Sequence, residues 1–193
     1  MKMKFLAMFT ALTLLAGCQN APPVTETPQL VFDTLPAISM NVARIEIVDA
    51  YQPPMRAPNV DHLFKQTPRE VARRVLEKQL VANGSINTLR VTIEDASVVK
   101  KDLRLTGGVA GFFNNEQSEE YSSRVHLKFD LLSEENPDSV VADAFVTSER
   151  SQTLLEDSSP AERDMTFFNL DEEIMKDLRH GIEGTVRRTF GWK

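Results

Sequence analysis

Residues 119–132 read EEYSSRVHLKFDLL, and apolar and polar side chains alternate along them with a period of two. The apolar side comprises Tyr121, Val125, Leu127, Phe129 and Leu131. The polar side comprises Arg124, His126, Lys128 and Asp130. Such alternation is typical of a β-strand that buries one face and exposes the other. The run therefore predicts a sheet with one covered face, and other segments must supply the cover.

Three more strands are predicted around this central run. Residues 40–49 alternate in the same way, and residues 88–99 place Leu89, Val91 and Ile93 on one side. A fourth strand is expected over 139–154, after a turn at Asn136-Pro137-Asp138. The glycine-rich residues 106–115 would form the tip of a long hairpin before the central run.

A first helix is predicted from Thr67, which forms a capping box with Glu70 and is followed by proline at the first helical position. Its expected buried stripe is Val71, Val75, Leu76, Leu80 and Val81. Asn83-Gly84 would end it.

A long second helix is predicted from Ser159, which has proline next and Glu162 three residues on. Its buried stripe would be Phe167, Leu170, Ile174, Leu178, Ile182 and Val186. Its water-facing side would be Asp171, Glu172, Lys176, Asp177 and Arg179. Gly181 and Gly184 either weaken the last turns or allow close approach to the sheet.

The expected element order is β-α-β-β-β-α, with a proline-containing loop over 51–62 after the first strand. One-sided strands and one-sided helices predict an α+β fold. We expect a two-layer sandwich, with a mainly antiparallel four-stranded sheet and two helices packed on one face. Residues 38–193 would form a single globular domain.

The N-terminal residues 1–17 have the pattern of a secretion signal. Lys2 and Lys4 precede an uncharged apolar run over 5–16 that ends in small residues. About a dozen apolar residues are too few to cross a hydrocarbon core, which takes roughly 20.

Leu15-Ala16-Gly17-Cys18 resembles the lipobox of bacterial lipoproteins. The resemblance implies cleavage between Gly17 and Cys18, a diacylglyceryl thioether on Cys18 and a further acyl chain on its amine. The alternative is that Cys18 is an ordinary thiol after an ordinary signal. Gln19 at the next position, by resemblance to lipoprotein sorting in enteric bacteria, favours the outer over the inner membrane.

The acylated Cys18 and a proline-rich tether are expected over 18–37, with Val31, Phe32 and Leu35 free to dock on the domain. The whole chain carries a net charge of −6, and removing the two lysines of the signal makes it −8. An acidic domain without a basic stripe is not expected to bind nucleic acid. Its membrane contact should come from the lipid on Cys18.

No catalytic, metal or cofactor motif is found. His62, His126 and His180 are not spaced as metal ligands, and the glycines at 107–111 lack the lysine and hydroxyl residue of a phosphate loop. The acidic residues cannot be paired from sequence into a glycosidase site. We therefore expect no enzyme activity, no metal and no cofactor.

The hairpin tip is unusual because it carries the large apolar residues Val109, Phe112 and Phe113. Clustered exposed apolar residues mark interaction surfaces. These three side chains either contact a partner protein or membrane, or fold back onto the domain or onto the proline loop.

The element order over about 38–190 resembles small envelope lipoproteins, such as the LPS-assembly lipoprotein and the auxiliary lipoproteins of ABC-type lipid transporters. The segment 45–62, IEIVDAYQPPMRAPNVDH, is similar to a stretch of alphaproteobacterial lipoproteins, from which no activity carries over. The resemblance implies a periplasmic non-enzymatic accessory that binds an envelope protein or lipid. The alternatives are an envelope hydrolase acting on glycan or ester, and a structural lipoprotein that contacts the cell wall.

Overall fold

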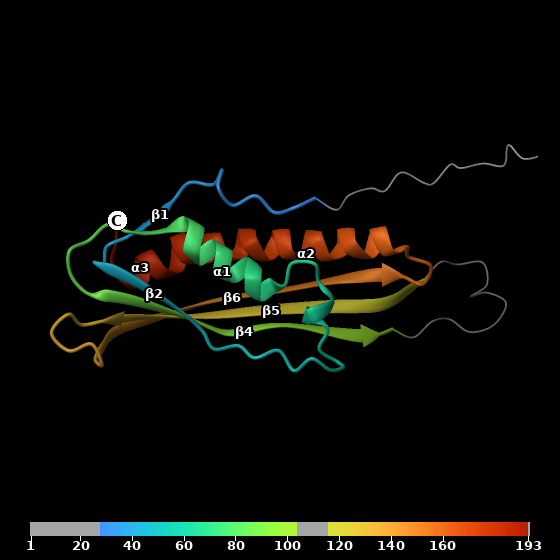
Figure 1. The fold of residues 1–193 in the computed structure, drawn as a ribbon, viewed down its shortest axis with the longest axis horizontal. Coiled ribbons are helices and arrows are strands. Elements are labelled where there is room, and N and C mark those ends of the chain that lie inside the picture. Colours follow the sequence, from blue (N-terminus) through green and yellow to red (C-terminus); the bar gives the residue numbers. More distant parts are fainter. Residues whose placement is uncertain (1–27, 104–115, 193) are drawn as a thin grey trace, which may run out of the picture.

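The computed structural model describes residues 28–103 and 116–192. They form two layers, a twisted sheet and a layer of helices on one of its faces (Figure 1). The strands are β1 (Ile38–Met40), β2 (Arg44–Asp49), β3 (Leu80–Ala82), β4 (Thr88–Asp102), β5 (Gln117–Leu132) and β6 (Val140–Leu155). The helices are α1 (Pro68–Gln79), α2 (Pro160–Gly181) and α3 (Arg187–Thr189), with short turns η1 (Asp61–Leu63) and η3 (Ile182–Val186).

The main sheet has four strands in the order β2-β4-β5-β6. The pairings β4–β5 and β5–β6 are antiparallel, whereas β2 runs parallel to β4. The predicted α+β class and the mainly antiparallel four-stranded sheet are therefore confirmed. The parallel pair arises because α1 returns the chain to the same edge, as crossover connections do.

The chain around β1 differs from the prediction. The expected single strand over 40–49 is two strands, β1 and β2, separated by a bend at 41–43. Likewise, α1 ends at Gln79 instead of continuing to Asn83, and the next residues form β3, which pairs in parallel with β1. Leu80 is buried, but Val81 is 45% exposed, so its place in the buried stripe was wrong.

The helices begin where their caps predict. Thr67 with Glu70, and Ser159 with Glu162, form complete capping boxes, each with proline next. The predicted stripe of α2 and η3, from Phe167 to Val186, is buried throughout. It packs against β6 and α1, and the inward residues of β5 complete the core.

Asp171 is the exception on α2. The helical pattern places it on the water-facing side, but it is only 3% exposed. Burial, and secondarily the charge of Glu70, raise the pKa of Asp171 to about 8. The prediction was wrong because α1 packs across this side of α2, a tertiary contact that helical periodicity does not contain.

Gly181 lies where α2 meets the sheet. A Cβ atom there would stand 2.5 Å from Cγ1 of Val146 in β6, whereas at Gly184 the nearest atom would be at an ordinary 3.5 Å. Of the two predicted roles, Gly181 therefore has the second, because it allows α2 to approach the sheet closely.

Two irregular segments pack against the sheet and the helix layer. The proline loop lies along β4 beyond the end of its pairing with β2, where Val60 N donates to Val98 O (2.9 Å) and Lys100 N donates to Pro58 O (2.9 Å). Residues 28–37 run along the outer side of the helix layer (Figure 1), with Leu30 and Phe32 buried. The guanidinium of Arg74 on α1 stands 5.8 Å from the ring centre of Phe32.

Candidate functional site

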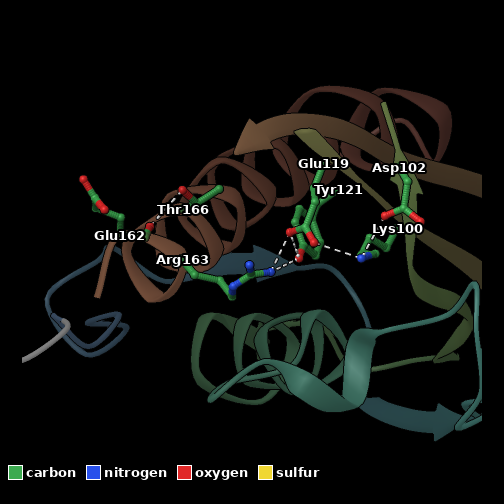
Figure 2. Close-up of polar contacts among 7 residues, drawn as sticks. All are labelled: Lys100, Asp102, Glu119, Tyr121, Glu162, Arg163 and Thr166. Atoms are coloured by element: carbon green, nitrogen blue, oxygen red, sulfur yellow. Dashed lines mark hydrogen bonds and ion pairs between the residues drawn. The ribbon is translucent and has the colours of Figure 1, made fainter. Parts of the chain in front are cut away.

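A cluster of polar groups lies at the end of the β4–β5 pair that is nearest residues 104–115 (Figure 2). Glu119 on β5 accepts from Lys100 Nζ on β4 at 2.9 Å and from Arg163 Nη1 on α2 at 2.6 Å. Tyr121 OH donates to Glu119 Oε2 at 2.8 Å and accepts from Arg163. Lys100 Nζ also pairs with Asp102 Oδ1 at 2.9 Å.

These contacts fix the protonation state of the cluster. Burial alone would raise the pKa of Glu119, but hydrogen bonds from Lys100, Tyr121 and Arg163 lower it to about 2. Burial and the bond to Glu119 raise the pKa of Tyr121 to about 12. Hydrogen bonds to Glu119 and then Asp102 raise the pKa of Lys100. At neutral pH Glu119 is therefore ionised, Lys100 keeps its positive charge, and Tyr121 keeps its hydroxyl proton.

The cluster is attached to the core through Tyr121, which is 1% exposed. The Tyr121 ring meets Phe167 of α2 edge-on, with centroids 4.9 Å apart, and Phe167 stacks on Phe64 at 4.0 Å. Aromatic pairs at these distances contribute about 1 kcal/mol each beyond their burial. This end of the β4–β5 pair, the start of α2 and Phe64, which follows the proline loop, are thus in contact with one another.

We call these side chains the clamp, because their contacts join β4, β5 and α2 at the last described residues before 104–115. Leu103 N donates to Ser118 O at 2.8 Å and continues the ladder to the limit of the described residues. Val109, Phe112 and Phe113 lie outside those residues, so their contacts stay a prediction.

A groove of about 510 Å³ lies between residues 29–35 and α2. Its apolar lining is Leu30, Val31, Leu35, Phe168 and Met175. Its polar lining is Gln29, Glu172, Lys176, Arg179, His180 and Glu183.

The charges around the groove are mostly paired with one another. Lys176 Nζ lies 3.0 Å from carboxylate oxygens of both Glu172 and Glu173. Arg179 pairs with Glu183 at 3.3 Å and also donates to Gln79. A groove with an apolar lining and a neutralised rim suits an apolar or amphipathic side chain better than a small ion.

The same geometry bears on the hydrolase alternative. Glu172 and Glu183 are eleven positions apart on one continuous helical segment, which is roughly 16 Å at 1.5 Å per residue. Glycosidase carboxyls stand about 5–9.5 Å apart. These two carboxylates therefore do not fit that mechanism.

The three histidines lie on three different elements, η1, β5 and α2. His62 is exposed in η1, and His180 is exposed at the groove. His126 lies on the open face of the sheet, where Nδ1 is 2.7 Å from Thr147 Oγ1 and the ring stacks on Phe145. Within residues 28–103 and 116–192, no group of three metal-ligating side chains is assembled.

Gly17 and Cys18 precede the described part of the chain, so cleavage and acylation stay predictions. In the part that the structure describes, no helix combines the length and apolar character needed to cross a membrane.

Sequence reasoning missed both the clamp and the groove. One signal was present, because Glu119 shares the inward side of its strand with Tyr121, and a carboxylate at such a position needs cationic partners. The partners come from β4 and α2, and nothing local to the sequence pairs them. The groove depends on how residues 28–37 lie on α2, which periodicity does not encode.

No protein-family model matches the chain, and no curated protein matches it. Solved structures with a similar fold include rare lipoprotein B from Shewanella oneidensis, with 11% identity, a TM-score of 0.37, and coverage of 71% of this chain and 89% of that one. A minor lipoprotein from Acinetobacter baumannii has 10% identity, a TM-score of 0.34, and coverage of 79% and 92%. A PelC dodecamer from Paraburkholderia phytofirmans has 14% identity, a TM-score of 0.27, and coverage of 77% and 89%. At these scores the names describe those proteins alone.

Proposed function

We propose that this chain is a membrane-anchored periplasmic lipoprotein that acts as a non-enzymatic binding module in envelope assembly or transport. The observation that carries the proposal is Leu15-Ala16-Gly17-Cys18 at the end of the apolar run over 5–16, ten residues before Pro28, the first residue that the structure describes. Two or three acyl chains on Cys18 would make attachment stable, whereas one gives only marginal binding. Gln19 favours the outer membrane.

Chain length limits how far the domain stands from its anchor. Ten residues span at most about 35 Å when fully extended. Residues 28–37 lie on the outer side of the helix layer, so the groove is near the end of the chain that leads to the anchor. The domain would therefore act on partners close to the membrane surface.

Two features support partner binding. The clamp of Lys100, Glu119, Tyr121 and Arg163 gives a rigid stem to a tip that contains three large apolar residues. The groove offers a second apolar surface on the helix layer. A rigid support beneath an apolar contact lowers the entropy that binding must overcome.

Photo-cross-linking in living cells tests the proposed contact. A photoreactive amino acid would replace Val109, Phe112 or Phe113, and as a control Ile86, which is 56% exposed in the turn before β4 at the opposite end of that strand. We expect one envelope partner, identified by mass spectrometry, to be captured from the tip positions and not from Ile86. Equal capture from all four positions, or none from the tip, would refute this contact.

A genetic test uses serine at all three tip positions. Under the proposal, the variant remains anchored and folded but loses the partner in pull-downs, and envelope integrity falls. Unchanged pull-downs and an intact envelope would remove the tip from the account.

A further inference from the structure

The strand β6 forms one edge of the main sheet. It pairs with β5 along its length, and no other described segment pairs with it. Helix α2 packs on its face, not in its plane (Figure 1), so the backbone groups along its outer edge are unpaired within residues 28–103 and 116–192. Sixteen residues is long for an open edge, because strands usually have about five or six.

Apart from one irregularity, where Leu131 pairs with Ala142 and Leu132 with Val140 so that Val141 is the extra residue, this edge lacks the features that usually prevent strands from pairing between molecules. Proteins protect edges with proline, lysine, bulges or short strands. The sequence of β6, VVADAFVTSERSQTLL, contains no proline, glycine or lysine. Its outward side carries Val141 at 60%, Phe145 at 47% and Leu155 at 37% exposure.

The strand is also complementary to itself in one antiparallel register. When two copies pair symmetrically about Thr147, residue positions that add up to 294 lie opposite each other. Asp143 then faces Ser151 of the other copy and lies diagonal to its Glu149, and Glu149 faces Phe145, so no like charges lie directly opposite each other. Val141 faces Thr153 and lies diagonal to Leu155 of the other copy. These exposed apolar side chains therefore meet at both ends of the paired strands.

Among the symmetric registers centred on an outward-facing residue of β6, the one about Thr147 pairs the longest stretch of the strand. Symmetry about Asp143 or Glu149 places two carboxylates opposite each other, and symmetry about Val146 sets Asp143 against Glu149. Symmetry about Thr147 also pairs nearly the whole strand, from Val140 to Leu154. A two-fold contact of this kind closes on itself and leaves no open β6 edge.

We infer that two copies of this chain associate through β6, antiparallel and centred on Thr147, to form one continuous sheet of twice four strands. The contact is independent of the proposed anchor, and it leaves the hairpin tip and the groove free for other partners.

Cysteine cross-linking tests both the contact and its register. The chain has one cysteine, Cys18, so the unmodified chain supplies the background. Thr147→Cys places two thiols opposite each other, and the Cα–Cα spacings of antiparallel strands, about 4.5 or 5.5 Å, lie within disulfide range. Thr153→Cys is the matched control on the same outward side, since its two copies would be twelve positions apart, about 40 Å.

The full-length chain is oxidised in intact envelopes and run on non-reducing gels. The inference predicts a shift to twice the chain mass for Thr147→Cys and none beyond background for Thr153→Cys. Co-expression of separate Val141→Cys and Thr153→Cys chains should restore the dimer. Equal dimer from Thr147→Cys and Thr153→Cys, no dimer from Thr147→Cys, or a cross-link to a protein of different mass would each overturn it.

Discussion

Two carboxyl groups on α2, six residues apart, have opposite environments. Asp171 is buried between helices with its Oδ1 atom unpartnered, and its pKa is raised to about 8. Asp177 accepts from Arg150 Nε at 2.7 Å and from Ser148 at 2.8 Å. Burial would raise the pKa of Asp177, but these hydrogen bonds lower it overall. The two groups should therefore contribute to stability with opposite dependence on pH.

Asp171→Asn should stabilise the protein at neutral pH. Between pH 4 and 8 the native state keeps the Asp171 proton and the unfolded state loses it, so this group lowers stability as pH rises, by about 1.4 kcal/mol per unit. Asparagine has no carboxyl proton to lose on unfolding, so the free energy of unfolding should rise by on the order of 4 kcal/mol at pH 7. Urea unfolding at pH 5 and pH 7.5 measures it, and the gain should be larger at pH 7.5.

The control is Asp177→Asn, which should lower stability by about 1–3 kcal/mol because it breaks charge-assisted bonds. A loss of stability in Asp171→Asn at pH 7.5 would mean that Asp171 is ionised and partnered in the native state.

Glu119→Gln should weaken the clamp. The carboxylate pKa of about 2 lies below its ordinary value, so its stabilisation is present above pH 4.5 and is lost as pH falls toward 2. Removing the charge leaves Lys100 and Arg163 without their shared partner, at a cost of about 3 kcal/mol. Hydrogen exchange should rise at the ends of β4 and β5.

Glu120→Gln is the matched control, since Glu120 lies on the other side of β5 and pairs with exposed Lys101 at 3.9 Å. It should change stability by less than about 0.5 kcal/mol. Equal losses in the two variants would show that the clamp adds nothing specific.

At the scale of elements, α2 depends on one small residue. Gly181→Ala should destabilise by about 1–3 kcal/mol, because the new methyl group meets Val146 at 2.5 Å and the packed interface must shift. Gly184→Ala, three residues on, meets only an ordinary contact and should stabilise by about 0.5–1 kcal/mol. Thermal unfolding of the two variants separates them. A change in stability of the same sign in both variants would argue against the close contact between α2 and β6.

Local sequence patterns predict the helices and strands of this chain well, but they predict poorly which segments pack against each other. The alternation around Phe129 and the caps at Thr67 and Ser159 are properties of neighbouring residues, and the structure confirms them. The pairing of β1 with β3 and the burial of Asp171 depend on segments far apart in the chain. A strand of three residues also has too short a pattern to distinguish it from the end of a helix.

At the scale of the whole molecule, the account describes an acidic two-layer domain attached by its N-terminal side to a membrane. The helix layer carries residues 28–37 and the groove, while the other face of the sheet displays exposed ion pairs such as Arg124–Glu149 at 3.4 Å. Polar ladders of this kind suit a face that stays in water. The proposed anchor would determine where these surfaces act, so it is the claim on which the functional account depends.

Growth with radiolabelled palmitate, followed by immunoprecipitation of the chain and of its Cys18→Ser variant, tests that claim directly. The account predicts label in the wild-type band, and none in the variant, which should also keep its signal and run as a larger precursor. An unlabelled wild-type chain, or a Cys18→Ser variant that is still processed and still sediments with membranes, would contradict it.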